Sequence, residues 1–117
     1  MPLFMYQFKY TPAAWAAFVK KPEDRPRRSY PSGHATMGFS VGVVLAALMP
    51  EKAQAILARA ADYAYSREIC GDHYHSDTEA SHALGVSIGT MLLRSPALKS
   101  DLEAAKAELR AAHLSTE

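Results

Sequence analysis

The sequence contains a single cysteine, Cys70, which excludes a fold held together by internal disulfide bonds, and we expect it to be a small buried residue. Its longest apolar run, Met37–Met49, has 13 residues, fewer than the ~18 that an ordinary membrane-spanning helix needs. Neither sign of charge dominates, because 13 Lys and Arg residues oppose 12 Asp and Glu residues and leave a net charge of +1. That balance gives no support for nucleic-acid binding through bulk charge. We therefore expect a protein with no membrane span and no nucleic-acid partner.

The composition is that of an ordinary globular domain. Hydrophobic residues make up 49% of the chain and charged residues 21%, which argues against disorder. A chain of 117 residues is long enough to bury one core, so we expect a single domain over residues 1–117. The sequence has no internal repeat and no sustained alternation of apolar and polar residues. The expected fold class is therefore all-α, in the form of a helical bundle.

Four main helices are predicted from local signals. The capping residues at Ser32–Gly33 open the first helix, and Pro50 ends it. Helical spacing of apolar residues marks the second, and a Ser-x-x-Glu pattern at Ser76–Glu79 marks the start of the third. A shorter helical pattern lies within residues 10–21. The predicted ranges are about 32–49, 51–65, 76–93 and a last helix that opens at Ser95-Pro96 or restarts at Ser100.

The segment Pro31-Ser32-Gly33-His34 places polar groups at the start of a long apolar helix. Unpaired backbone N–H groups and the positive end of the helix dipole favour an oxyanion such as phosphate at that point. Ser32 adds a hydroxyl donor, Gly33 allows a close approach of the backbone, and His34 can donate a proton near neutral pH. The alternative interpretation is an ordinary helix cap, in which Ser32 is the N-cap and His34 is exposed.

A second polar segment, residues 66–77, contains Arg67, His73 and Asp77. The planar guanidinium of Arg67 suits phosphate oxygens. Asp77 follows His73 by four residues, so a helical turn would let its carboxylate bond one ring nitrogen and make the other more nucleophilic. One alternative is a solvated loop between helices. The other is a metal site built from His73, Asp77, Asp72 and His75.

These two segments resemble parts of the signature of the phosphatidic acid phosphatase type 2 and vanadium haloperoxidase superfamily. The second part of that signature, Pro-Ser-Gly-His, stands at residues 31–34. The third part, Ser-Arg-x5-His-x3-Asp, runs from Ser66 to Asp77 without a gap, about thirty residues further on. The surrounding sequence is most similar to the bacterial class A non-specific acid phosphatases. The similarity extends from about Arg28 to the last helix, roughly three quarters of the chain.

The resemblance implies an acid phosphatase that hydrolyses small phosphomonoesters through a phosphohistidine and without a metal. His73 would be the nucleophile, Asp77 would orient it, and His34 would protonate the leaving alcohol and then activate water. The phosphate would be held by Ser32, Gly33 and Arg67. No cofactor is implied for this activity, although vanadate would inhibit it. Two alternatives are a haloperoxidase with vanadate as its cofactor and a degenerate phosphate-binding fragment without activity.

The first part of the signature, Lys-x6-Arg-Pro, is incomplete. Arg25-Pro26 is the one Arg-Pro pair before residue 31, and the residue seven positions before Arg25 is Phe18 instead of Lys. Residues 20–28 nevertheless carry five basic and two acidic side chains, so Lys20, Lys21 or Arg25 could replace the missing cations. We therefore expect residues 1–27 to be a divergent segment with a basic loop, residues 28–117 to be the family-like core, and the activity to be weak.

The resemblance implies that the chain corresponds to the C-terminal part of such an enzyme, and we expect its N-terminal region to be divergent or truncated. A shorter bundle leaves an apolar face uncovered, including parts of Phe39, Val41, Val44, Leu45 or Leu93. Self-association would cover that face, so we expect a homo-oligomer. The resemblance also implies a periplasmic location, but residues 1–12 lack the pattern of a secretory signal, so the location is not assigned.

Overall fold

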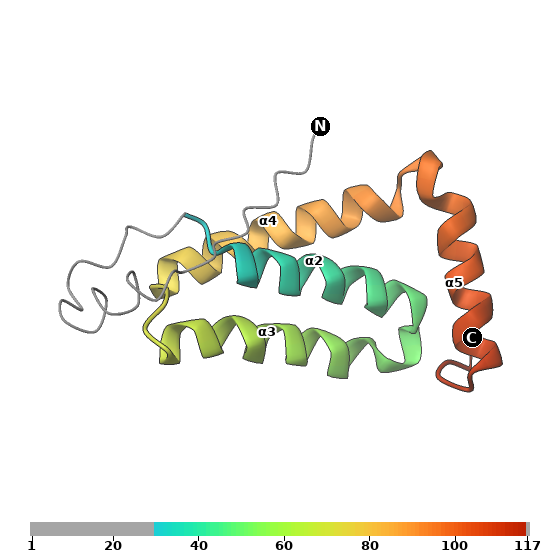
Figure 1. Ribbon diagram of the computed structural model, residues 1–117, viewed down its shortest axis with the longest axis horizontal. Coiled ribbons are helices and arrows are strands. Elements are labelled where there is room, and N and C mark those ends of the chain that lie inside the picture. The colour runs from blue at the N-terminus through green and yellow to red at the C-terminus, as the bar shows by residue number, and fades with distance from the viewer. Residues whose placement is uncertain (1–29, 117) are drawn as a thin grey trace, which may run out of the picture.

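The computed structural model describes residues 30–116 and confirms the all-α class (Figure 1). The described residues form four α-helices and two short 3₁₀ turns, with no strand among them. The helices are α2 (Gly33–Leu48), α3 (Ala53–Ile69), α4 (His75–Leu93) and α5 (Lys99–Ala111), and the 3₁₀ turns are η2 (Pro50–Lys52) and η3 (Pro96–Leu98). The helical pattern within residues 10–21 and the basic loop at residues 20–28 lie outside the described range.

Helix α2 forms the centre of the fold. It packs against α3 on one side and α4 on the other, whereas α3 and α4 contact each other far less (Figure 1). The core between these helices consists of the small side chains Ala35, Ala60 and Ala64 and the ring of Phe39. Helix α5 crosses the end of the bundle at which α2 finishes and α3 begins (Figure 1). No described helix is both long enough and apolar enough to span a bilayer.

Glycines on α4 allow its backbone to touch that of α2. A Cβ atom on Gly85 would lie 2.6 Å from both the carbonyl oxygen of Thr36 and the Cβ of Phe39. On Gly89, one turn later, a Cβ would lie 2.9 Å from the carbonyl oxygen of Ser40. Because these neighbours include backbone atoms, they cannot rotate away, and only glycine fits at this helix spacing.

The structure confirms most of the predicted helix limits and corrects the end of α3 and the start of α4. α2 and the end of α4 match the prediction, while α3 continues four residues beyond Tyr65 because no breaker stands before Gly71. The predicted Ser76–Glu79 box is wrong: α4 begins at His75, and its N-cap Tyr74 is bonded by Asp77. Of the two starts predicted for the last helix, Ser95-Pro96 opens the η3 turn, and α5 itself begins at Lys99, one residue before Ser100.

We predict that Gly85→Ala destabilises the fold by about 1–3 kcal/mol, because the added methyl group pushes the α2 and α4 backbones apart. Urea unfolding monitored by circular dichroism measures the change. Gly33→Ala is the matched control, since a Cβ at that helical position meets nothing within 4 Å. Equal stability of the Gly85→Ala and wild-type proteins would contradict this packing.

Candidate active site

Three helix ends bring the polar segments together at one end of the bundle. The start of α2, the end of α3 and the start of α4 lie beside one another, at the opposite end from α5 (Figure 1). Ser32, Gly33 and His34 belong to the first of these ends, Arg67 to the second, and Asp77 to the third. His73 lies in the loop between α3 and α4, at residues 70–74.

Ser32 caps α2 as the local sequence indicates. Its Oγ accepts a hydrogen bond from the backbone N–H of Ala35 at 3.2 Å, and the residue is fully buried. Gly33 is exposed, and the space where a Cβ would stand is open. The backbone N–H groups of Gly33 and His34 have no acceptor among residues 30–116. The start of α2 therefore presents two N–H donors and the positive end of the helix dipole to its surroundings.

Ser81 ties the start of α2 to α4. Its Oγ lies 2.9 Å from the carbonyl oxygen of Ser32 and 2.7 Å from that of Asp77, so its single hydroxyl proton is shared between them. Ser81 is fully buried. Sequence reasoning missed this residue, because a serine in the middle of a helix is usually exposed. Its spacing from Asp77, Gly85 and Gly89, four residues at each step, is the signal that could have placed it on the face toward α2.

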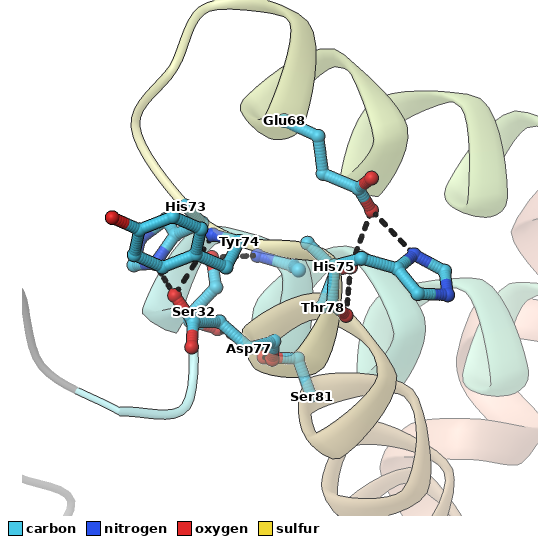
Figure 2. Close-up of polar contacts among 9 residues, drawn as sticks. Ser32, Glu68, His73, Tyr74, His75, Asp77, Thr78 and Ser81 are labelled. Carbon is cyan, nitrogen blue, oxygen red and sulfur yellow. Dashed lines mark hydrogen bonds and ion pairs between the residues drawn. The ribbon is translucent and has the colours of Figure 1, made fainter.

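His73 and Asp77 form the contact that their four-residue spacing allows. His73 Nδ1 lies 3.1 Å from Asp77 Oδ2, and the side chain of His73 is only 5% exposed (Figure 2). The same carboxylate oxygen accepts the backbone N–H of Tyr74 at 3.0 Å, which holds the carboxylate in place. An ionised Asp77 keeps the ring proton on Nδ1 and leaves the lone pair on Nε2. The pair is thus arranged as an oriented base or nucleophile.

Arg67 contributes through both its side chain and its main chain. Its Nη1 lies 3.9 Å from Asp72 Oδ2, and its guanidinium carbon lies 5.3 Å from the centre of the Tyr63 ring. Its carbonyl oxygen accepts the backbone N–H groups of Asp72 at 2.9 Å and His73 at 3.2 Å. Gly71, with φ of 68°, makes the tight turn that these bonds need. The loop that carries His73 is therefore folded back onto the end of α3.

A second polar cluster, absent from the sequence predictions, lies on the other side of the first turn of α4 (Figure 2). Glu68 Oε1 accepts a hydrogen bond from Thr78 Oγ1 at 2.5 Å and lies 3.2 Å from His75 Nδ1. The hydrogen bond from Thr78 lowers the pKa of Glu68 below its usual value, and His75 lowers it further. Glu68 is therefore ionised at neutral and mildly acidic pH.

The structure also bears on one alternative, one expectation and one candidate residue of the sequence analysis. The metal site of His73, Asp77, Asp72 and His75 does not form, because His73 turns to Asp77 whereas His75 turns to Glu68. Residues 30–116 contain no group of three or more such side chains placed to hold a metal ion. Cys70 is exposed instead of buried. His34 is exposed on the first turn of α2.

Comparisons with known proteins agree with the two motifs. The sequence model of the PAP2 superfamily matches residues 4–100. The chain is 39% identical over 87 residues to the acid phosphatase of Zymomonas mobilis, an alignment that covers 74% of this chain and 33% of that protein. It is 37% identical over 93 residues to the non-specific acid phosphatase of Salmonella typhimurium, covering 76% and 37%. The chain thus spans about a third of the length of the curated relatives that it matches.

We predict that Ser81→Ala costs about 1 kcal/mol of stability and loosens the start of α2, because the Ser32 carbonyl loses its link to α4. Hydrogen exchange detected by NMR will then be faster at the amides of Ala35 and Thr36. Ser87→Ala is the control, since Ser87 Oγ bonds only the Ala83 carbonyl within α4. Equal exchange rates in the two variants would contradict the role given to Ser81.

Proposed function

Because the chain belongs to the PAP2 superfamily, we propose that it is an acid phosphatase that hydrolyses small phosphomonoesters. The observation that carries the proposal is the His73–Asp77 pair, an oriented imidazole at the end of the bundle where α2 starts (Figure 1). Two N–H groups at the start of α2, those of Gly33 and His34, have no acceptor among residues 30–116. The relatives named as acid phosphatases support the same reaction class over a haloperoxidase. The relatives extend well beyond the part that this chain matches, so their full activity is assigned to this chain only as a proposal.

The proposed reaction has two steps. In the first, His73 Nε2 forms a bond to phosphorus while the bond from phosphorus to the ester oxygen breaks, and protonated His34 gives its proton to the leaving alcohol. In the second, His34 takes a proton from water, which attacks the phosphohistidine. Inorganic phosphate leaves and His73 is restored. The position of His34 on an exposed turn suits a group that exchanges protons with water.

Binding and charge stabilisation fall to three residues. Arg67, the Ser32 hydroxyl and the Gly33 N–H would donate to the equatorial phosphate oxygens, whose charge changes in the transition state. Ser32 Oγ accepts from Ala35, which leaves its own proton to be donated. Asp77 stabilises the positive charge that develops on His73 as the phosphorus–nitrogen bond forms.

The proposed reaction uses only side chains and water, and neither a metal nor another cofactor takes part in its steps. Vanadate, which forms a five-coordinate adduct with a nucleophile, would bind at His73 and inhibit. Lys20, Lys21 or Arg25, outside the described residues, would supply further cations for the phosphate. Because no lysine stands seven positions before Arg25, we propose that the activity is weak.

We predict that the protein hydrolyses p-nitrophenyl phosphate between pH 4 and 8, and that His73→Ala lowers kcat about 10³-fold or more. Asp77→Asn keeps the shape of the side chain but removes its charge, and lowers kcat by a smaller factor. His34→Ala accumulates the phosphohistidine, because a p-nitrophenolate leaving group needs little acid help whereas the attacking water still needs a base. Rapid acid-free quenching with ³²P-labelled substrate detects the intermediate.

His113→Ala is the control for these variants, since His113 is exposed beyond the end of α5. Its kcat stays at the wild-type value. Turnover by His73→Ala at the wild-type rate overturns the proposal. If neither the wild-type protein nor any variant turns over the substrate, the result supports the degenerate phosphate-binding fragment. Halide oxidation with vanadate and peroxide, in the absence of phosphatase activity, supports the haloperoxidase.

We also propose that the chain forms a homo-oligomer. Two residues expected on an uncovered face have opposite outcomes. Phe39 is buried against α4, so the expectation is wrong for this residue, whereas Val41 is 50% exposed. Met37, one turn earlier on α2, is 54% exposed. Further large apolar side chains are exposed on α4, among them Leu84, Val86, Met91 and Leu92. Such surfaces favour self-association.

We predict that sedimentation at micromolar concentration shows a dimer or a larger oligomer, and that Val41→Glu shifts it toward monomer. In an oligomer that covers this face, the carboxylate introduced by Val41→Glu would be buried without a partner, which disfavours association. Gln54→Glu is the control, because Gln54 is exposed on α3 and is not apolar. A monodisperse wild-type monomer would contradict the proposed association.

A further inference from the structure

Glu68 joins the two helices on either side of the loop that carries His73. It stands in the last turn of α3, and its two partners, His75 and Thr78, stand in the first turn of α4. A single carboxylate oxygen makes both contacts (Figure 2). We refer to Glu68, His75 and Thr78 as the clasp. Glu68 and His75 stand at positions that the Ser-Arg-x5-His-x3-Asp motif leaves unspecified, and Thr78 follows the motif. None of the three has a role in the proposed reaction.

Thr78 is the stronger partner in the clasp. It is 4% exposed, and its Oγ1 also lies 2.9 Å from the carbonyl oxygen of His75. The side chain of Glu68 is 19% exposed, whereas that of His75 is 75% exposed. Water screens the His75 contact and weakens it. The bond from Thr78 to an ionised carboxylate is shielded and charge-assisted, so it carries most of the link.

The clasp matters because few other contacts join α3 and α4 directly. Each packs mainly on α2, and they contact each other far less. The loop between them, residues 70–74, is anchored at its α3 end by the carbonyl of Arg67. At its α4 end, Asp77 holds both the ring of His73 and the N–H of Tyr74. The clasp fixes the distance between these two anchors.

We propose that Glu68, through Thr78, is a positioning residue that sets where His73 stands relative to Arg67. This inference rests on the proposed function, in which His73 attacks the phosphorus whose oxygens Arg67 binds. Attack in line requires the nucleophile and the bound phosphate to be held in register, and a displacement of about 1 Å can cost about 100-fold in rate. Glu68 touches neither group and acts only by holding α3 and α4 together.

The test compares Thr78→Val with Thr78→Ser. Valine keeps the size of the side chain but removes the hydroxyl, whereas serine keeps the hydroxyl. We expect Thr78→Val to lower kcat for p-nitrophenyl phosphate about 10- to 100-fold per folded molecule, and Thr78→Ser to restore most of it. Thr90→Val is the matched control, since Thr90 Oγ1 bonds only the Val86 carbonyl within α4.

Glu68→Ala completes the design. If the clasp acts as one unit, Glu68→Ala and Thr78→Val each give the same fall in kcat, and the double variant falls no further. Glu68→Gln keeps an acceptor for Thr78 and falls less than Glu68→Ala. A fall in stability alone would change the folded fraction and leave kcat per folded molecule unchanged, so the folded fraction is measured by circular dichroism for every variant.

Hydrogen exchange provides a readout that needs no turnover. The amides of Asp72 and His73 are bonded to the Arg67 carbonyl, and we expect them to exchange about tenfold faster in Thr78→Val than in Thr90→Val. If the wild-type protein has no phosphatase activity, the proposed function fails, while faster exchange still shows that the clasp holds the loop. The positioning role is overturned if Thr78→Val matches Thr90→Val in exchange, or if the active protein keeps its kcat in Thr78→Val.

Discussion

The direct contact between the backbones of α2 and α4 is the constraint on which the rest of the structure depends. Gly85 and Gly89 let the two helices approach until side chains no longer fit between them. At that distance the buried hydroxyl of Ser81 reaches the carbonyl of Ser32. Residues 77, 81, 85 and 89 are spaced one turn apart, so one stripe of α4 both packs on α2 and carries Asp77 toward the start of α2.

The polar end of the bundle combines two sources of positive potential with an imidazole that one carboxylate orients. The start of α2 offers N–H groups, Arg67 offers a guanidinium, and His73 offers an imidazole. Asp77 bonds both the ring of His73 and the backbone at the start of α4, so one side chain sets the rotamer of the imidazole and ends the loop. An arrangement of this kind suits a tetrahedral dianion.

Features encoded by neighbouring residues could be predicted from the sequence. The start of α2 follows from Ser32 and Gly33 because an N-cap is a local signal, and the His73–Asp77 contact follows from a four-residue spacing. The predicted start of α4 was wrong because two acidic residues are candidates for the capping carboxylate. Glu79 fits the standard capping box after Ser76, but Asp77 is the residue that accepts the N–H of Tyr74.

Contacts between distant parts of the chain could not be predicted in this way. Ser81 and Ser32 are 49 positions apart, and nothing local shows that a mid-helix serine faces a helix cap. Glu68 and Thr78 are separated by 10 positions across a loop whose path depends on Gly71. Cys70, expected to be buried as a small apolar residue, is exposed at the C-cap position of α3.

Arg67 divides its work between main chain and side chain. The carbonyl that secures Asp72 and His73 belongs to the peptide backbone and is present whatever residue occupies the position. The guanidinium, by contrast, can be exchanged without cutting that anchor. The anion binding proposed for the guanidinium and the anchoring of the loop by the carbonyl can therefore be changed independently by mutation. A substitution at this position would alter the proposed affinity for a charged ligand while the backbone still holds His73 in place.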